Sequence, residues 1–230
     1  MNENIVETLV AEILKRLQKK VLLVLTNAGG YQDEIYTRMC HYNNFSFSIM
    51  IAENAVNQHD VDKWRQLGDI VNFDEHSLPA ALDKFDSLFI PFLDFETMGD
   101  VANGIFTTDG AQVINYALMK NINVLALDYN CNPKSELNQV LGLNKNAGYN
   151  EQLQTNINKI VSSGVQLCTM NEIESNLNPA ESISESEPRG IIESPLRYIT
   201  LNDVINSGRD SFSNNEKLTD LAVEYLKAQK

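Results

Sequence analysis

The amino-acid sequence predicts an α/β protein with a Rossmann-like, three-layer architecture around a parallel sheet. Val21 to Leu25 is a continuous apolar run, which is typical of a strand buried on both faces. Similar runs recur at 45–52, 87–91 and 123–128, and segments with helical periodicity separate them. Strands that alternate with helices build a parallel sheet covered on both faces. In such sheets, ligands bind beyond the carboxyl ends of the strands.

The individual elements follow from the pattern of apolar residues. Strands are expected at 21–25, 45–52, 69–73, 87–91, 123–128 and 165–169. Helices are expected at 31–41, 61–67, 78–84, 97–120 and 151–163. The long fourth helix contains Gly104 and Gly110, and we expect a break near one of them because glycine weakens a helix. Together these elements form one domain over residues 19–170.

An amphipathic helix over residues 1–18 precedes this domain. Its polar face carries glutamate, lysine and arginine, and its apolar stripe recurs every fourth residue at Ile5, Leu9, Ile13 and Leu17. Because a short helix gains little from propensity alone, the stripe must rest on another surface. One hypothesis is that it docks into a groove of a partner protein. The alternative is that it folds back on its own domain; a membrane-surface helix is disfavoured because the stripe lacks aromatic residues.

The composition excludes several classes of function. The 230-residue chain has a net charge of −13 and a pI near 4.6, so it repels phosphate backbones and nucleic-acid binding is not expected. No apolar run approaches the length of a membrane span, and the N-terminus lacks the apolar core of a secretory signal. The three cysteines are scattered, and none forms a ligand-like pair with a histidine, which indicates a reduced, cytosolic protein without disulfides or a metal site.

The chain changes character after the expected domain. Residues 171–195 include an acidic, serine-rich stretch at 181–188, so we expect a solvated linker there. Helical and strand patterns return in a C-terminal segment over 196–230. This segment begins with a short strand that ends at Thr200, a candidate N-cap for the turn or helix that follows, and it contains a helix over 218–228.

The loop after the first strand is a candidate anion site. Asn27, Gly29 and Gly30 lie in it, and the glycines permit a sharp turn and close approach of the backbone to a ligand. The free N–H groups of the following helix would point at a phosphate. A plain, tight βα turn explains the glycines equally well, since no Gly-Lys-Ser/Thr signature is present. Asp33 and Glu34 at the helix start would repel a bound phosphate.

A second candidate site follows the strand at 87–91. Pro91 ends this strand and fixes the exit of the loop. Asp94, Glu96 and Thr97 come next, and they should lie at the carboxyl edge of the sheet. The two loops therefore supply most of the side chains that a ligand at this edge would meet.

The residues around this second site resemble a known family. The frame consists of Ile90-Pro91, Thr97, Val101-Ala102-Asn103-Gly104-Ile105, 117–120 and 124–126. It is similar to that of the FMN-binding cysteine-decarboxylase flavoproteins, over roughly 21–169. The resemblance implies a flavoprotein-like fold, a homo-oligomer (a trimer) and FMN as the cofactor. The cofactor contacts would come from Asn27, Gly29, Gly30, Pro91, Thr97 and Asn103.

The same resemblance implies catalytic candidates. His76 lies upstream of the strand at about the place of the family's catalytic histidine. The family motif Pro-Ala-Ser-Ala-Asn-Thr is altered in this chain, with Glu96 before Thr97. A glutamate there would repel a substrate carboxylate, so decarboxylation of cysteine is not expected.

Both ends of the chain resemble proteins of bacterial microcompartments. The segment 5–17 is similar to the encapsulation peptides of microcompartment cargo. The tail over 198–204, with Leu218 to Ala222, resembles the C-terminal segment of the propanediol-utilisation microcompartment proteins of the M type. The resemblance implies a shell protein or a cargo enzyme as the partner of the N-terminal helix. It also implies a cytoplasmic location within a microcompartment.

Two functional hypotheses follow. The first is an accessory or structural component of a compartment for diol (propanediol) degradation, in which the flavoprotein-like core is an oligomerising scaffold. The second is an active FMN-dependent flavoenzyme, decarboxylase-like or redox, with His76 as acid or base. A plain nucleotide-binding Rossmann module is a weaker third, because the full glycine fingerprint is missing.

Overall fold

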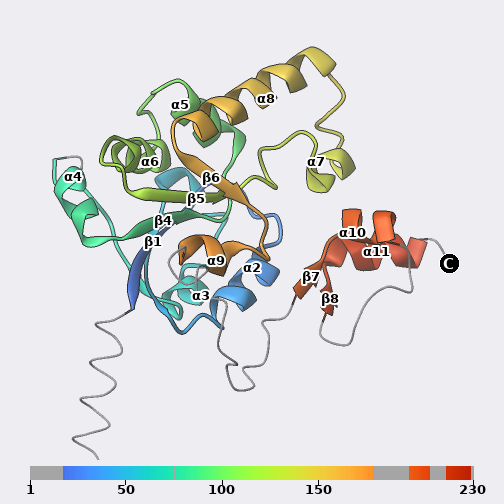
Figure 1. Cartoon of the computed structure of the whole chain (residues 1–230), viewed down its shortest axis with the longest axis horizontal. Coiled ribbons are helices and arrows are strands. Elements are labelled where there is room, and N and C mark those ends of the chain that lie inside the picture. The colour runs from blue at the N-terminus through green and yellow to red at the C-terminus, as the bar shows by residue number, and fades with distance from the viewer. Residues whose placement is uncertain (1–17, 75, 179–196, 208–215, 229–230) are drawn as a thin grey trace, which may run out of the picture.

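Six parallel strands form the central sheet of the computed structural model, which describes residues 18–74, 76–178, 197–207 and 216–228 (Figure 1). The strand order is β3-β2-β1-β4-β5-β6. The strands are β1 (Lys19–Leu25), β2 (Phe45–Ile51), β3 (Asp69–Ile70), β4 (Ser87–Ile90), β5 (Asn123–Leu127) and β6 (Val165–Cys168). Every strand of this sheet lies where the apolar runs predict it, so the predicted parallel α/β architecture is confirmed. The amphipathic helix predicted over 1–18 lies almost wholly outside the described residues.

Three helices cover one face of the sheet: α2 (Gln32–Met39), α3 (Val61–Arg65) and α9 (Ile173–Leu177). Successive side chains of a strand point to opposite faces, so Val21, Leu23 and Leu25 of β1 share this face. They pack in one cluster with Ile35 of α2 and Trp64 of α3, and all five side chains are fully buried. Figure 1 shows these helices together below the sheet.

Four helices cover the opposite face: α4 (Leu78–Ala81), α5 (Phe95–Ala102), α6 (Asp109–Met119) and α8 (Ala147–Ser162). Leu22 and Val24 of β1 point to this side and pack with Met98, Ile114 and Ile157. The short helices η1 (Glu53–Ala55), η2 (Leu82–Lys84) and α7 (Glu136–Val140) lie in the connections. The sheet therefore separates two apolar clusters, which is the predicted three-layer arrangement.

The segment predicted as one helix over 97–120 forms two helices. Helix α5 ends at Ala102, and Gly104 adopts φ +65, a left-handed conformation that favours glycine. Helix α6 then starts at Asp109, where the hydroxyl of Thr108 accepts a hydrogen bond from the N–H of Ala111 at 3.2 Å. The break thus lies at Gly104, and Gly110 lies within α6.

The start of the predicted linker is helical. Residues 173–177 form α9, and Ile173 and Leu177, four positions apart, are buried against the sheet. Two apolar residues at helical spacing outweigh the polar composition around them. This corrects the boundary at 171; the acidic part of the linker, 181–188, lies outside the described residues.

The C-terminal segment forms a small unit of its own. Strand β7 (Arg197–Ile199) pairs in parallel with β8 (Glu216–Leu218), and the helices α10 (Leu201–Ser207) and α11 (Asp220–Ala228) follow them. Strand β8 includes Leu218, which the periodicity assigns to a helix. Thr200 caps α10 as predicted: its hydroxyl accepts the N–H of Asp203 at 3.4 Å, and the Asp203 carboxylate accepts the N–H of Thr200 at 2.9 Å.

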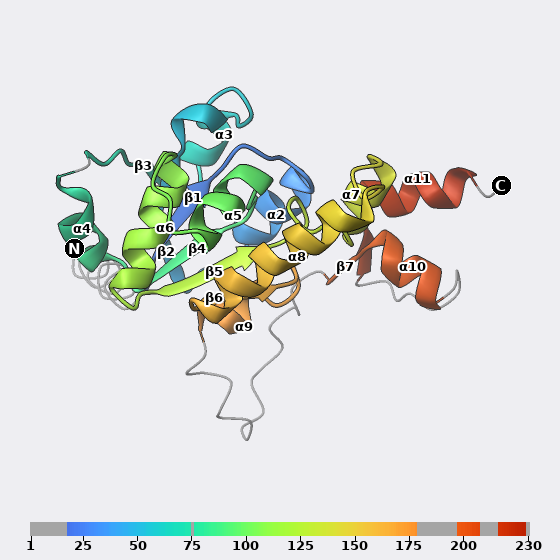
Figure 2. The same cartoon turned by 90° about the horizontal axis from the view of Figure 1, so that it is seen from above.

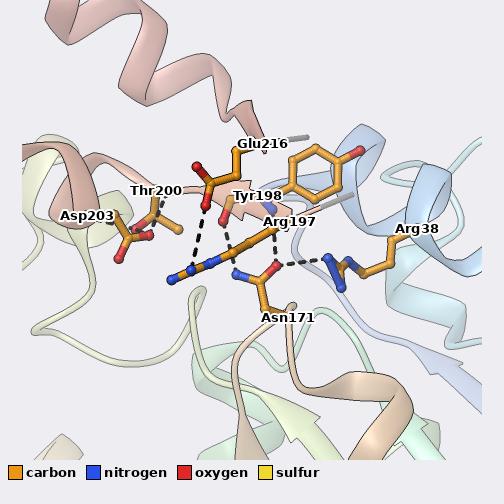
Figure 3. A network of polar contacts seen from close by, with 7 residues as sticks. All are labelled: Arg38, Asn171, Arg197, Tyr198, Thr200, Asp203 and Glu216. Atoms are coloured by element: carbon orange, nitrogen blue, oxygen red, sulfur yellow. Dashed lines mark hydrogen bonds and ion pairs between the residues drawn. The ribbon is translucent and has the colours of Figure 1, made fainter. Parts of the chain in front are cut away.

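Polar contacts attach this unit to the sheet domain, beside α7 (Figure 2). The amide oxygen of Asn171 accepts hydrogen bonds from the guanidinium of Arg38 at 2.9 Å and from the N–H of Tyr198 at 3.1 Å, and its amide nitrogen donates to the Tyr198 carbonyl at 3.0 Å (Figure 3). The Tyr198 ring is buried in the sheet domain's cluster. Within the described residues, every helix is too short or too polar to span a bilayer.

Candidate functional site

The strand order reverses between β1 and β4, so the crevice beyond their carboxyl ends is the expected ligand site. The loop after β1 contains Asn27, Gly29 and Gly30, and the loop after β4 runs from Pro91 into α5. Since parallel strands end at the same edge, the fold brings the two candidate sites of the sequence together.

The side chain of Asp94 joins the two loops across the crevice. Its carboxylate accepts hydrogen bonds from the N–H of Asn27 at 3.1 Å, from the N–H of Thr97 at 2.8 Å and from the Thr97 hydroxyl at 2.9 Å. A further bond runs from the Thr26 hydroxyl to the carbonyl of Phe92 at 2.5 Å. Asp94 is 7% exposed and is the N-cap of α5. A buried, fully used carboxylate thus holds β1 and β4 closed at this point.

The glycines of the β1 loop lie against the protein's own side chains. A Cβ added to Gly29 would lie 2.5 Å from the amide nitrogen of Gln58, and one added to Gly30 would lie 2.3 Å from Leu137. The N–H of Gly30 donates to the side-chain oxygen of Asn130 at 2.9 Å. Close packing within the chain therefore accounts for both glycines, as expected of a tight βα turn.

His59 supports this loop, although the sequence offers no signal for it. The ring is 4% exposed, and its Nε2 lies 2.8 Å from the Thr26 carbonyl, which can only accept, so Nε2 carries the hydrogen. Its Nδ1 then accepts from the amide of Gln32 at 3.0 Å. Burial lowers the pKa of His59 below its ordinary value. The ring, tilted by 33° against Phe92 with the ring centroids 5.1 Å apart, thus positions the loop through its two hydrogen bonds.

A polar cavity of about 340 Å³ lies beside the closed crevice. Its walls come from the loop after β1, from η1, from the first turn of α5 and from the start of α6 with the two residues before it. The lining residues are Asn27, Glu53, Asn54, Glu96, Thr107, Thr108 and Asp109. Three of these are carboxylates and none is basic, so the cavity is a region of negative potential.

The sequence-predicted residues divide into three groups. Asn27 and Glu96 line the polar cavity; Thr97 is buried beneath it, 1% exposed, and Pro91 is buried at the end of β4. Asn103 is exposed at the far end of α5, where it binds Lys159 Nζ at 3.0 Å. His76 is exposed on the connection before α4, and its N–H donates to Asp74 at 3.1 Å. Neither Asn103 nor His76 lines the cavity.

Comparison with known proteins gives a fold but no family. No protein-family model matches the chain, and no curated protein matches its sequence. One similar solved structure is that of DmrB from Burkholderia xenovorans in complex with FMN, which is described as a cubic protein cage for redox transfer. It is 12% identical to this chain, with a TM-score of 0.54, and the match covers 72% of this chain and 97% of DmrB.

Two further structures have the same fold. The FMN-dependent cysteine decarboxylase TvaF of thioviridamide biosynthesis is 14% identical, with a TM-score of 0.51 and coverage of 72% and 97%. The dodecameric FMN-dependent UbiX-like decarboxylase of Escherichia coli O157:H7 is 10% identical, with a TM-score of 0.50 and coverage of 75% and 99%. The flavoprotein-like α/β fold predicted from the sequence is therefore confirmed.

Three of the four backbone N–H groups of residues 27–30 are already bonded within the protein, which disfavours binding of the FMN phosphate at this loop. A phosphate needs free backbone donors or cations. The N–H groups of Asn27 and Gly30 are bonded to Asp94 and Asn130, and the N–H of Ala28 is bonded to the Thr26 carbonyl at 2.8 Å. The charged side chains of the adjoining cavity are all carboxylates. Among the described residues there is also no group of three or more His, Cys, Asp or Glu side chains that could hold a metal ion.

Proposed function

We propose that this chain is a non-enzymatic accessory component of a bacterial microcompartment for diol degradation, with the flavoprotein-like core as its scaffold. The observation that carries the proposal is the closed crevice. Asp94 and Asn130 accept hydrogen bonds from the N–H groups of Asn27 and Gly30, and Gln58 packs against Gly29, so the protein's own side chains engage the loop that would hold a cofactor phosphate.

The ends of the chain supply the compartment part of the proposal. The stripe of the N-terminal segment, formed by Ile5, Leu9, Ile13 and Leu17, would dock on a shell protein or on a cargo enzyme. The core would assemble into a homo-oligomer, since two proteins of this fold are described as a cage and as a dodecamer. Together these features describe a cytoplasmic scaffold within a propanediol-type compartment.

The competing function is an FMN-dependent flavoenzyme, which the fold of the three FMN proteins favours. A visible absorption spectrum of the purified full chain, followed by titration with FMN, separates the two functions. We expect colourless protein and no quenching of FMN fluorescence. A yellow protein that loses its colour on acid treatment would overturn the scaffold proposal, and a known flavoprotein serves as the positive control.

The docking role has its own test. The double substitution Leu9→Glu and Ile13→Glu should release the chain from purified compartments, because it places two charges on the apolar stripe. The thermal unfolding of the core should stay unchanged. Glu7→Gln on the polar face is the matched control. A large fall in the unfolding temperature of the double variant would show instead that the helix packs on its own domain.

A further inference from the structure

A second cavity of about 300 Å³ adjoins the polar one, and its walls contain both polar and apolar side chains. Glu53 and Asp109 line both cavities, and the N–H of Glu53 donates to the Asp109 carboxylate at 3.1 Å. This bonded pair is therefore a ridge between two neighbouring hollows. The two cavities lie along the carboxyl ends of β1, β2 and β3, next to the closed crevice.

Six of the ten residues that line the second cavity are apolar: Met50, Ile51, Val56, Phe73, Leu78 and Val113. The other four are polar: Glu53, Asn72, Asp109 and Gln112. Most of the apolar ones belong to the core, but Val56, which follows η1, is 48% exposed and Phe73 is only partly buried. An apolar group that entered this cavity would remove both side chains from water, which favours binding.

The charges around the cavities define the chemistry of the occupant. Glu53, Glu96 and Asp109 supply three carboxylates, and neither cavity has a lysine, arginine or histidine in its walls. The ion pairs between described residues leave these three carboxylates out. The whole chain carries a net charge of −13, so the long-range field also attracts cations. An anionic ligand is excluded, and a cationic group is favoured.

Because Glu53 and Asp109 lie between the two cavities, an extended ligand is favoured over a compact one. One compact molecule cannot fill both hollows without displacing Glu53 and Asp109, whereas two nearby side chains of one peptide can lie on either side of them. We propose that the paired cavities bind a peptide segment of a partner protein, with an aliphatic side chain against the apolar residues of the second cavity and a lysine or arginine in the polar one. This site is separate from residues 1–17 and does not depend on the microcompartment role.

The test uses the full chain and fluorescein-labelled peptides read by fluorescence anisotropy. The probes are glycine-serine peptides in which one leucine and one arginine are separated by zero, one, two or three serines. Control peptides replace the arginine by glutamate or the leucine by serine. We expect at least one spacing to bind, both control peptides to lose binding, and the affinity to fall as salt is added.

Matched protein variants separate the site from the general charge of the chain. Glu96→Gln with Asp109→Asn keeps both hydrogen-bond acceptors and should weaken binding about fivefold to tenfold, as expected for two exposed charge contacts. Val56→Ser should also weaken binding because it removes apolar surface from the rim. Glu151→Gln with Glu224→Gln removes the same charge from exposed positions on α8 and α11 and should change the affinity less than about twofold. If no spacing binds, or if both double variants weaken binding equally, the proposal is wrong.

Discussion

The carboxylate of Glu136 offers the sharpest test of how the C-terminal unit is held. It is 5% exposed in α7 and accepts hydrogen bonds from the Tyr31 hydroxyl, from the N–H of Leu201 at 3.3 Å and from the N–H of Asn202 at 2.6 Å. Burial, and then the hydrogen bond to Glu136, raise the pKa of Tyr31 above its ordinary value, so its hydroxyl stays a donor. One side chain thus joins the β1 loop to the first turn of α10.

The substitution Glu136→Ala removes the acceptor from all three donors. A hydrogen bond to a charged group contributes about 1.5–3 kcal/mol to the free energy of unfolding, and a buried donor left without an acceptor lowers it by a similar amount. The bond to Leu201 is long and Asn202 is exposed to water, so Tyr31 dominates the loss. We expect a total of about 3 kcal/mol, which corresponds to a fall in Tm of roughly 6–12 °C for a chain of this size. Glu136→Gln keeps one acceptor oxygen and should cost about half as much.

Thermal unfolding followed by circular dichroism measures these values. Glu151→Gln, on the exposed side of α8, is the control for loss of one negative charge. Tyr31→Phe should have little further effect in the Glu136→Ala background, since the donor already lacks its acceptor. A Tm for Glu136→Ala within about 1 °C of the parent would refute the reasoning, because three bonds to a buried charge cannot be lost at no cost.

Three further predictions concern the closed crevice. Asp94→Ala removes both the cap of α5 and the bond to the β1 loop and should cost about 2 kcal/mol in urea unfolding, whereas Asp94→Asn should cost less than half of that. Gly30→Ala places a methyl group 2.3 Å from Leu137 and 2.6 Å from the side-chain oxygen of Asn130, and should cost about 1–3 kcal/mol in the same assay. Burial lowers the pKa of His59, so the unfolded chain binds a proton at this residue more readily than the folded chain does. The free energy of unfolding should therefore fall as the pH drops below 6.5, the ordinary pKa of histidine. If the free energy of unfolding of a His59→Gln variant has the same slope between pH 6.5 and pH 5 as that of the parent, this assignment is wrong.

The layers of the domain were readable in the sequence because they depend on local patterns. Leu22 and Val24 alternate with Val21 and Leu23 along β1, and each pair enters a different cluster. An unbroken apolar run can only be satisfied by a sheet that is covered on both sides. The Thr200 cap was likewise predictable, because its partner lies only three residues away.

The state of the site depends on contacts that no local pattern contains. Gly30 is hydrogen-bonded to Asn130 and Tyr31 to Glu136, across separations of 100 and 105 residues. The glycines of the β1 loop are compatible with a bound phosphate and with these contacts alike, so the sequence of the loop does not distinguish the two. The adjoining cavities, too, exist only because η1, α5 and α6 begin at the same edge of the sheet. Residue types and short spacings therefore establish the fold and the position of the crevice. Whether that crevice is open or filled depends on which distant side chains the folded backbone brings into it.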